Sequence, residues 1–173
     1  MTQVFGIVGW KNTGKTGLME RLVTEIAGRG LTVSTIKHAH HRFDVDQPGK
    51  DSYRHRHAGA QEVLLASANR WALMHELRGA PEPPLSDLRA MLAPADLVLI
   101  EGYKRDRHPK VETHRAAAGQ PLIAAGDRSV RAVASDSRHD GLEVPVFDLN
   151  ATGAIADFIL RETGLAALPR TGS

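Results

Sequence analysis

One stretch near the amino terminus has the residue types and spacing that bind phosphate groups. Residues 9–16, GWKNTGKT, match the motif G-x-x-x-x-G-K-[ST] at every fixed position. Glycines let the backbone turn so that successive N–H groups point at a phosphate. The ammonium group of Lys15 would reach the β- and γ-phosphates of a nucleotide, and the hydroxyl of Thr16 would ligate Mg²⁺. The residues expected to bind nucleotide here are Gly9, Lys11, Asn12, Thr13, Gly14, Lys15, Thr16 and Gly17.

The motif lies in the context that a phosphate loop requires. The apolar run at residues 4–8 predicts a buried strand that ends at the first glycine. Apolar residues between Thr16 and Arg29 fall on one stripe of a helix, whose N-terminus adds partial positive charge at the loop. A glycine turn can match the motif by chance. The strand before it and the amphipathic helix after it favour phosphate binding.

A second acidic group is expected near this loop. The buried strand predicted at residues 97–100 ends at Glu101, and the carboxyl ends of parallel strands share the edge of a sheet where ligands bind. Glu101 is therefore placed to hold the hydration shell of Mg²⁺ or to orient a water molecule, so Lys15 and Glu101 are the candidate catalytic residues. The alternative is a solvated glutamate at a strand end. Asp96, at the opposite end of the strand, is interpreted as a cap or a surface residue.

The strand predicted at residues 31–36 ends on the same edge and leads into a polar loop rich in histidine and aspartate. The basic residues expected at the rim of a second anionic ligand are Lys37, Lys50, Arg54 and Lys104. Asp51 is either a residue on the Mg²⁺ side of the site or the N-cap of a short helix. His38, His40 and His41 leave a transition-metal site open, although neighbouring residues on one loop rarely form a closed tetrahedral site.

The remaining pattern predicts an α/β fold. Further strands are predicted at 62–66, 71–74, 122–125, 131–134 and 145–147, and further helices at 86–92 and 152–162. Strands that alternate with helices predict a P-loop NTPase-like fold of three layers, with a mostly parallel sheet and helices on both faces. We expect one nucleotide-binding domain over residues 1–173, with a flexible tail at about 166–173. Trp71 and Met74 are expected in the core, and His55 and His57 on the surface.

Composition and charge exclude several classes of protein. With 42% hydrophobic and 24% charged residues, the chain is typical of a folded globular domain. It contains no cysteine, which excludes disulfides, iron–sulfur clusters and thiolate zinc sites. A formal net charge of +2 is too small for the basic face of a dedicated nucleic-acid binder. No apolar stretch approaches the roughly 18 residues of a membrane span and no signal peptide is evident, so we expect a cytoplasmic protein with no membrane or nucleic-acid partner.

Several motifs beyond the phosphate loop together resemble one protein family. They are IKHAHH at 36–41, DVDQPGKDS at 44–52, RWALM at 70–74, EGYK at 101–104 and AVASD at 132–136. In this combination the chain resembles the molybdopterin-guanine dinucleotide biosynthesis adapter (MobB) family. The resemblance runs from about residue 3 to residue 162. The histidine loop combined with PGKDS is far more specific than the phosphate loop alone.

The resemblance implies a GTP-binding homodimer of the P-loop class with weak Mg²⁺-dependent GTPase activity at most. Members assist the attachment of GMP to molybdopterin, which gives the guanine dinucleotide form of molybdenum cofactor, and act with a molybdopterin guanylyltransferase. Transferred to this sequence, residues 11–16 hold GTP, Thr16 and Glu101 face Mg²⁺, and residues 37–52 line the cleft of the pterin or the partner. The residues expected to contact ligand around that cleft are Lys37, His38, Lys50, Asp51 and Lys104.

The sequence departs from ordinary GTPases at three points. The guanine-binding N-K-x-D motif is absent, which leaves Asp136, after a short predicted strand, as the candidate for contacting the base. Trp10 follows the first glycine where related dimers carry a lysine, so we infer no lysine that reaches the other subunit. No glutamine or arginine is evidently placed to stabilise transition-state charge, in agreement with slow hydrolysis. The alternatives are a nickel-insertion GTPase, favoured by the histidines, and a small-molecule kinase with a lid at 80–95.

Overall fold

The computed structural model describes residues 1–39 and 43–167, and His40 and His41 of the histidine loop lie outside the described residues. The chain falls into two compact units. Unit 1 comprises Met1–His38 and Leu92–Ser173, and unit 2 comprises Ala39–Met91. Each unit has its own sheet. The expectation of a single domain with a flexible tail stays a prediction.

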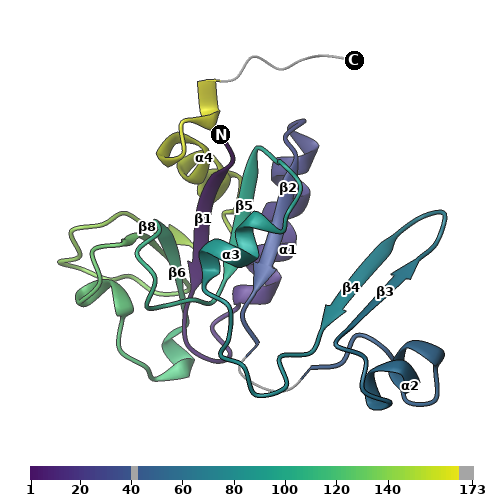
Figure 1. Cartoon of the computed structure of the whole chain (residues 1–173). Coiled ribbons are helices and arrows are strands. Elements are labelled where there is room, and N and C mark those ends of the chain that lie inside the picture. Colours follow the sequence, from purple (N-terminus) through teal and green to yellow (C-terminus); the bar gives the residue numbers. More distant parts are fainter. Residues whose placement is uncertain (40–42, 168–173) are drawn as a thin grey trace. The chain divides into compact units, whose positions relative to one another are not determined.

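Unit 1 contains a six-stranded sheet in which every neighbouring pair of strands is parallel. In spatial order its strands are β2 (Val33–Lys37), β5 (Leu97–Glu101), β1 (Gln3–Val8), β6 (Lys110–His114), β7 (Val130–Ser135) and β8 (Val146–Asp148). The central strand β1 lies between β5 and β6 (Figure 1). Because all the strands point the same way, the segments that follow them meet at one edge of the sheet.

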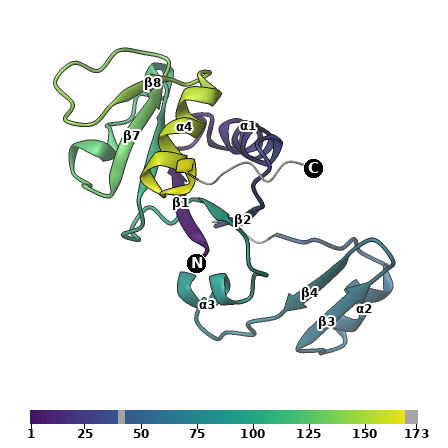
Figure 2. The same ribbon diagram turned by 90° about the horizontal axis from the view of Figure 1, so that it is seen from above.

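Two helices cover one face of this sheet. α1 (Lys15–Gly28) and α4 (Thr152–Glu162) lie side by side in Figure 2. Their apolar stripes share one core with Phe5 and Ile7, which are alternate residues of β1. Arg21 of α1 donates hydrogen bonds to the carbonyl oxygen of Leu149 and the hydroxyl of Thr152, at 2.8 and 2.9 Å. The predicted α/β class with a parallel sheet is confirmed.

The strand β6 was not predicted, and the strand expected at 122–125 is wrong. Residues Ile123–Ala125 form a 3₁₀ helix, η2, and a second one, η1, spans Ala116–Ala118. The backbone N–H groups of Ile123 and Ala124 donate to the carboxylate of Glu112, at 2.9 and 2.8 Å, instead of pairing with a strand. Glu112 is fully buried in β6. A charged residue in such a position makes the strand resemble a polar loop in the sequence.

Lys110 is a second charged residue that hides β6 in the sequence. Its side chain is fully buried in β6, and its ammonium group donates to the carbonyl oxygens of Lys104, at 3.0 Å, and of Asp106. The ammonium also lies 3.4 Å from the carboxylate of Asp127. Buried charge is tolerated where it is fully paired, so these contacts allow a lysine inside the sheet. They also attach the loop after β5 to the sheet.

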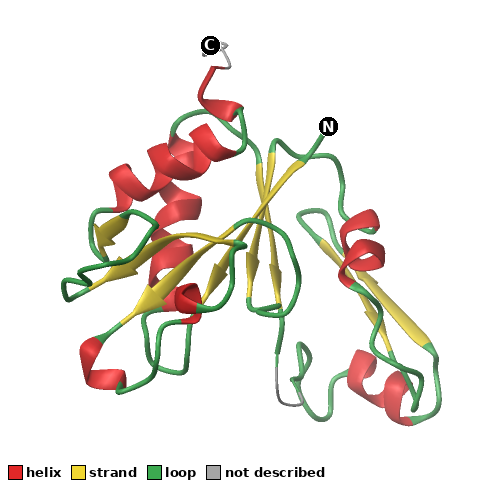
Figure 3. Ribbon diagram, turned by 90° about the vertical axis from the view of Figure 1, so that its left-hand side faces the viewer, coloured by secondary structure: helices red, strands yellow, loops and turns green. Residues whose placement is uncertain are grey.

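Unit 2 contains a short helix, a hairpin and a second short helix (Figure 3). These elements are α2 (Asp51–His57), the antiparallel strands β3 (Glu62–Ala66) and β4 (Trp71–His75), and α3 (Leu85–Ala90). His55 and His57 are exposed, as expected, and the strand pair at 62–66 and 71–74 is confirmed. One further helix, η3 (Leu165–Ala167), follows α4 in unit 1.

The expectation that Trp71 belongs to the core is wrong, since its side chain is 69% exposed. Leu64 lies directly opposite Leu73 in the hairpin, and alternation along β4 places Trp71 on the same face. We call Leu64, Trp71 and Leu73 the hairpin face; all three are more than half exposed, at 63%, 69% and 51%. The other face carries Val63, which is buried, opposite Met74, which is partly buried. A two-stranded sheet therefore packs one face and leaves the other uncovered.

Candidate functional site

The phosphate loop connects β1 to α1, as the motif requires. A Cβ atom on Gly9 would lie 2.4 Å from the hydroxyl oxygen of Thr113 in β6, a distance that no side chain tolerates. Gly14 has a φ of +94°, in the left-handed region that favours glycine. Both glycines of the motif are therefore needed by the backbone itself. The predicted strand, loop and helix context is confirmed.

Two threonines, Thr13 and Thr113, hold the phosphate loop against β6. Thr13 is fully buried, and its hydroxyl donates to the carbonyl oxygen of Trp10 at 2.8 Å. The hydroxyl oxygens of Thr13 and Thr113 lie 2.8 Å apart, and that of Thr113 is 3.1 Å from the carbonyl oxygen of Val8. The Thr13 side chain thus supports the loop. Because the Thr13 hydroxyl is engaged within the protein, the contact with nucleotide predicted for this residue would be made by its backbone N–H.

The start of α1 supplies donors to the same place. The first N–H groups of a helix, here those of Lys15, Thr16 and Gly17, have no partner within the helix and bind anions. The ammonium of Lys15 donates to the carbonyl oxygen of Trp10 at 2.6 Å. Burial, followed by the charges of Lys104 and Lys37, lowers the pKa of Lys15, and Glu101 opposes this effect. An anion in the loop would therefore relieve a local excess of positive charge.

Thr16 and Glu101, the two predicted Mg²⁺ residues of unit 1, lie together. The Thr16 hydroxyl donates to the Glu101 carboxylate at 3.2 Å, and the Lys37 ammonium lies 3.5 Å from the same oxygen. Glu101 is only 8% exposed. A hydroxyl and a carboxylate are the hard oxygen donors that Mg²⁺ prefers, so the residues present fit that ion. Their role as ligands stays a prediction.

The Glu101–Thr16 pair makes a test of the metal site possible. Glu101→Gln keeps an oxygen that accepts from Thr16 but removes the negative charge. We expect the gain in nucleotide affinity on adding Mg²⁺ to fall about tenfold, because a charged ligand of the cation is lost. Titration of a fluorescent GTP analogue with and without Mg²⁺ measures this gain. Glu143→Gln, at an exposed glutamate, is the matched control; an unchanged Mg²⁺ effect in Glu101→Gln would argue against a role for this carboxylate.

Other predicted residues line the loop from the side of β5. The backbone N–H of His38 donates to the carbonyl oxygen of Glu101 at 3.0 Å, and the His38 ring lies against Tyr103, tilted by 31° with 4.6 Å between the ring centroids. The ammonium of Lys104 lies 4.1 Å from the centre of the Trp10 ring, a cation–π contact. Lys11 and Asn12 are exposed at the turn of the loop. Lys104 therefore lies next to the phosphate loop, and His38 lies next to Glu101 and Tyr103.

A cavity of about 480 Å³ opens at the carboxyl ends of β7 and β8. Its lining comprises residues 135–140 and 146–148. Asp136, the predicted contact of the base, belongs to this lining, and one of its carboxylate oxygens accepts from the backbone N–H of Ala116 at 2.9 Å. Within the lining the Ser135 hydroxyl contacts the ring of His139 at 2.9 Å. The cavity is lined by apolar side chains and by hydrogen-bond donors and acceptors.

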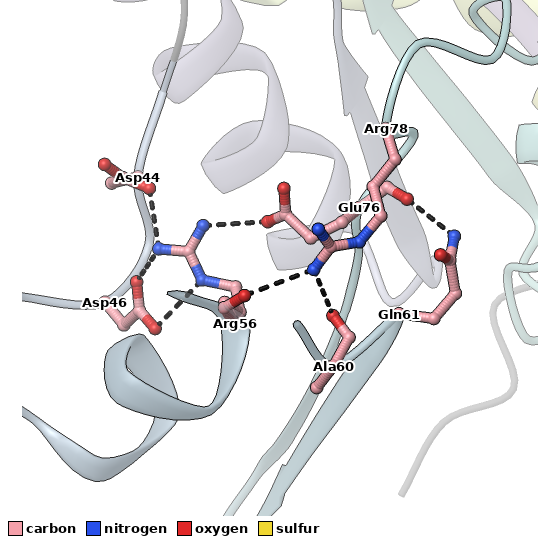
Figure 4. Close-up of polar contacts among 7 residues, drawn as sticks. All are labelled: Asp44, Asp46, Arg56, Ala60, Gln61, Glu76 and Arg78. Carbon is pink, nitrogen blue, oxygen red and sulfur yellow. Dashed lines mark hydrogen bonds and ion pairs between the residues drawn. The ribbon is translucent and has the colours of Figure 1, made fainter. Parts of the chain in front are cut away.

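In unit 2 the first two aspartates of the DVDQPGKDS motif, Asp44 and Asp46, pair with an arginine (Figure 4). The guanidinium of Arg56, 13% exposed, pairs with Asp44 and Glu76, each at 2.8 Å, and with Asp46. Asp51 is the first residue of α2 rather than its N-cap; it is exposed and lies 3.9 Å from Arg54. Asp44 and Asp46 thus hold the segment that carries Lys50 and Asp51. The ligand roles predicted for Lys50 and Asp51 stay predictions.

Arg56 makes the stability of unit 2 sensitive to acid. Hydrogen bonds from the Arg56 guanidinium hold the pKa of the Asp46 carboxyl below its ordinary value of about 3.9. A lowered pKa stabilises the fold above the ordinary value, and this contribution is lost as the pH falls through the lowered one. We expect the urea midpoint of the wild type to fall between pH 5 and pH 3 by more than that of Asp46→Asn. If the urea midpoint fell equally in the two proteins, the Arg56–Asp46 pair would not contribute to the pH dependence of stability.

The transition-metal alternative finds no support in the described part of the chain. No group of three or more histidine, aspartate or glutamate side chains within residues 1–39 and 43–167 is arranged to hold a metal ion. His40 and His41 are outside these residues, so the prediction concerning them stays untested. No described helix is long and apolar enough to cross a membrane.

One residue at the loop was missed in the sequence. No arginine was evident at this site in the sequence, but Arg115, directly after β6, places its guanidinium beside Gly14. Its Nε and Nη2 atoms lie 3.4 Å from where a Cβ on Gly14 would be. The sequence contained no signal for it, since the strand that positions Arg115 was itself not predicted.

A parallel sheet with a phosphate loop after its central strand, and an acidic residue at the end of the neighbouring strand, defines the P-loop class of nucleotide-binding proteins. Within that class the family described as molybdopterin guanine dinucleotide synthesis protein B (MobB) matches residues 4–136. The chain belongs to the MobB family.

Relatives match nearly the whole chain. The molybdopterin-guanine dinucleotide biosynthesis adapter protein of Escherichia coli is 40% identical over 92% of this chain and 93% of its own length. The protein of the same name from Haemophilus influenzae is 40% identical over 90% of this chain and 86% of its own length. The crystal structure of a MobB homologue from Bacillus stearothermophilus has 29% identity and a TM-score of 0.69, and covers 93% of this chain and 97% of that one. The predicted resemblance is confirmed, and it favours the adapter over the nickel-insertion alternative.

Proposed function

We propose that this protein is a GTP-binding adapter that assists the attachment of GMP to molybdopterin. The observation that carries the proposal is the arrangement of Lys15, Thr16 and Glu101 around the phosphate loop, in a chain of the MobB family. The relatives named as adapters in this biosynthesis are 40% identical over almost the full length. The partner enzyme is a molybdopterin guanylyltransferase, and the cell compartment is the cytoplasm.

In this proposal the chain's own groups hold the nucleotide at the edge of the sheet. The N–H groups of the loop and of the start of α1 bind the phosphates, and Lys15 exchanges the carbonyl oxygen of Trp10 for phosphate oxygens. Thr16 and Glu101 hold Mg²⁺, which neutralises phosphate charge when bound. Asp136 accepts from the guanine base in the cavity at β7 and β8. Any GTPase activity is weak, and Lys15 and Glu101 support it.

In this proposal the pterin and the partner enzyme contact basic side chains. His38 and Lys37 stand at the phosphate site, and Lys104 lies over the Trp10 ring. Within unit 2, Lys50 and Asp51 follow the segment in which Asp44 and Asp46 pair with Arg56, and we propose them as ligand contacts of that unit. Cationic side chains suit the phosphate of molybdopterin and of GTP alike.

We also propose a homodimer, and the hairpin supports it. An isolated two-stranded hairpin is marginally stable in water, and both of its edges carry unpaired backbone groups. The hairpin face presents apolar side chains that monomers rarely expose side by side. A second copy of the chain would cover this face through the same residues, as a two-fold interface requires.

The proposed function is tested by titrating the purified protein with fluorescent GTP and ATP analogues, with and without Mg²⁺, while phosphate release is followed. We expect preference for the GTP analogue, tighter binding with Mg²⁺ and slow phosphate release. Preference for ATP, or turnover at the rate of a typical kinase, would contradict the adapter and favour the small-molecule kinase.

A further inference from the structure

Arg115 approaches the phosphate loop from the side of β6. Its backbone is still extended, with φ −133° and ψ 131°, so the side chain continues the alternation of the strand. Arg115 and Thr113 therefore lie on the same side of β6. The Thr113 hydroxyl contacts Thr13, and the Arg115 guanidinium lies at Gly14. One strand thus contacts the loop at two successive points.

The charge of Arg115 is not used elsewhere in the described chain. Within residues 1–39 and 43–167, the guanidinium has no hydrogen bond and no ion pair. Arg21, Arg29 and Arg131 of the same unit have carbonyl or carboxylate partners, whereas Arg115, like the exposed Arg128, has none within the described residues. A guanidinium presents a planar fork of N–H donors that matches two phosphate oxygens at once. An unpaired fork next to a phosphate loop is therefore suited to a phosphate ligand.

The position of Arg115 also indicates which phosphates it reaches. Ala116, the next residue, donates its N–H to Asp136 at the cavity proposed for the base. Leu149, which follows β8, lies 3.3 Å from the same Gly14 position. Arg115 thus lies between the phosphate loop and that cavity. Glu101 and Thr16, on the opposite side of β1, belong to the flank of β5.

We propose that Arg115 is a nucleotide-binding residue that donates its guanidinium fork to the α- and β-phosphates, opposite the flank that carries Thr16 and Glu101. The inference rests on the proposed nucleotide binding but not on the identity of the base. It predicts that the contact is made equally in the diphosphate and the triphosphate, because the γ-phosphate lies beyond its reach.

The test compares Arg115→Ala, Arg115→Lys and Arg128→Ala with the wild type. Arg128 is exposed and precedes β7, so it lies at the amino edge of the sheet and serves as a control for the loss of one positive charge. Fluorescent GDP, GTP and ATP analogues are titrated into each protein in the presence of Mg²⁺. We expect Arg115→Ala to weaken GDP and GTP binding by the same factor, roughly tenfold to a hundredfold.

Arg115→Lys keeps the charge without the fork, so we expect a smaller loss, and Arg128→Ala should bind as the wild type does. Wild-type affinity in Arg115→Ala, while Lys15→Ala still abolishes binding, would overturn this inference alone. A loss confined to GTP would overturn the placement at the α- and β-phosphates. A wild-type protein that binds none of the three analogues would overturn both this inference and the proposed function.

Discussion

Replacing Lys15 by alanine is expected to weaken binding of GTP by about a hundredfold or more while leaving the fold intact. The ammonium is the loop's own cation for the phosphates, and charged hydrogen bonds to phosphate are among the strongest in proteins. Its contribution to the unliganded fold is small, because burial and the neighbouring Lys104 and Lys37 disfavour its charge, as its lowered pKa indicates. We therefore expect the free energy of unfolding to change by no more than about 1 kcal/mol.

The two effects are measured separately, by titration with a fluorescent GTP analogue and by urea unfolding without nucleotide. Arg128→Ala is again the charge control, since Arg128 lies at the other edge of the sheet. A Lys15→Ala protein that folds normally and binds GTP as tightly as the wild type would remove the phosphate loop from the proposed function. A variant that does not fold would show that the Lys15–Trp10 contact is structural.

Placing a charge on the hairpin face is expected to dissociate the proposed homodimer. Leu73 lies directly opposite Leu64 in the hairpin, and both are exposed in the single chain. Leu73→Glu would bury an unpaired carboxylate of each chain at the proposed interface. The cost of such an unpaired charge raises the dissociation constant of the dimer by about a hundredfold or more. Light scattering coupled to gel filtration over a range of protein concentrations measures this change.

Met91→Glu provides the matched control, because Met91 is an exposed apolar residue outside the hairpin, at 70% exposure. It should leave the mass unchanged. Dimers of undiminished stability in Leu73→Glu would place the interface elsewhere. A monomeric wild type would contradict the homodimer itself.

The parts of the site that depend on local pattern could be predicted from the sequence. Residues 9–16 and the strand that ends at Glu101 each contain their own signal, and parallel pairing then brings Thr16 and Glu101 together. The DVDQPGKDS segment was associated with ligand binding, but its Asp44 and Asp46 pair with Arg56, twelve and ten residues further on. No local pattern indicates a pairing of that kind.

The parts of the fold and the site that depend on long-range pairing could not be predicted from the sequence. β6 alternates Lys110, Glu112 and His114 with shorter residues, and such a run resembles a surface loop until its buried partners are known. Arg115 was missed for the same reason. Trp71 has the size of a core residue, but no layer covers its face of the hairpin within the described chain, so the side chain stays exposed. In each case the missing information was which other segment lies opposite.

The ammonium of Lys110 joins the Lys104–Asp106 turn to the middle of the sheet and to Asp127. Opening that turn would leave the buried ammonium without its hydrogen-bond acceptors. The free energy of this opening is comparable to that of local unfolding of the sheet. The segment that carries Lys104 is therefore part of the same cooperative unit as β6, although it lies at the surface. Amide protons of the turn would exchange with solvent at rates set by opening of the strand. If the proposed nucleotide binding is correct, Lys104 would meet the nucleotide from a fixed position over Trp10, and this segment would need no ordering on binding.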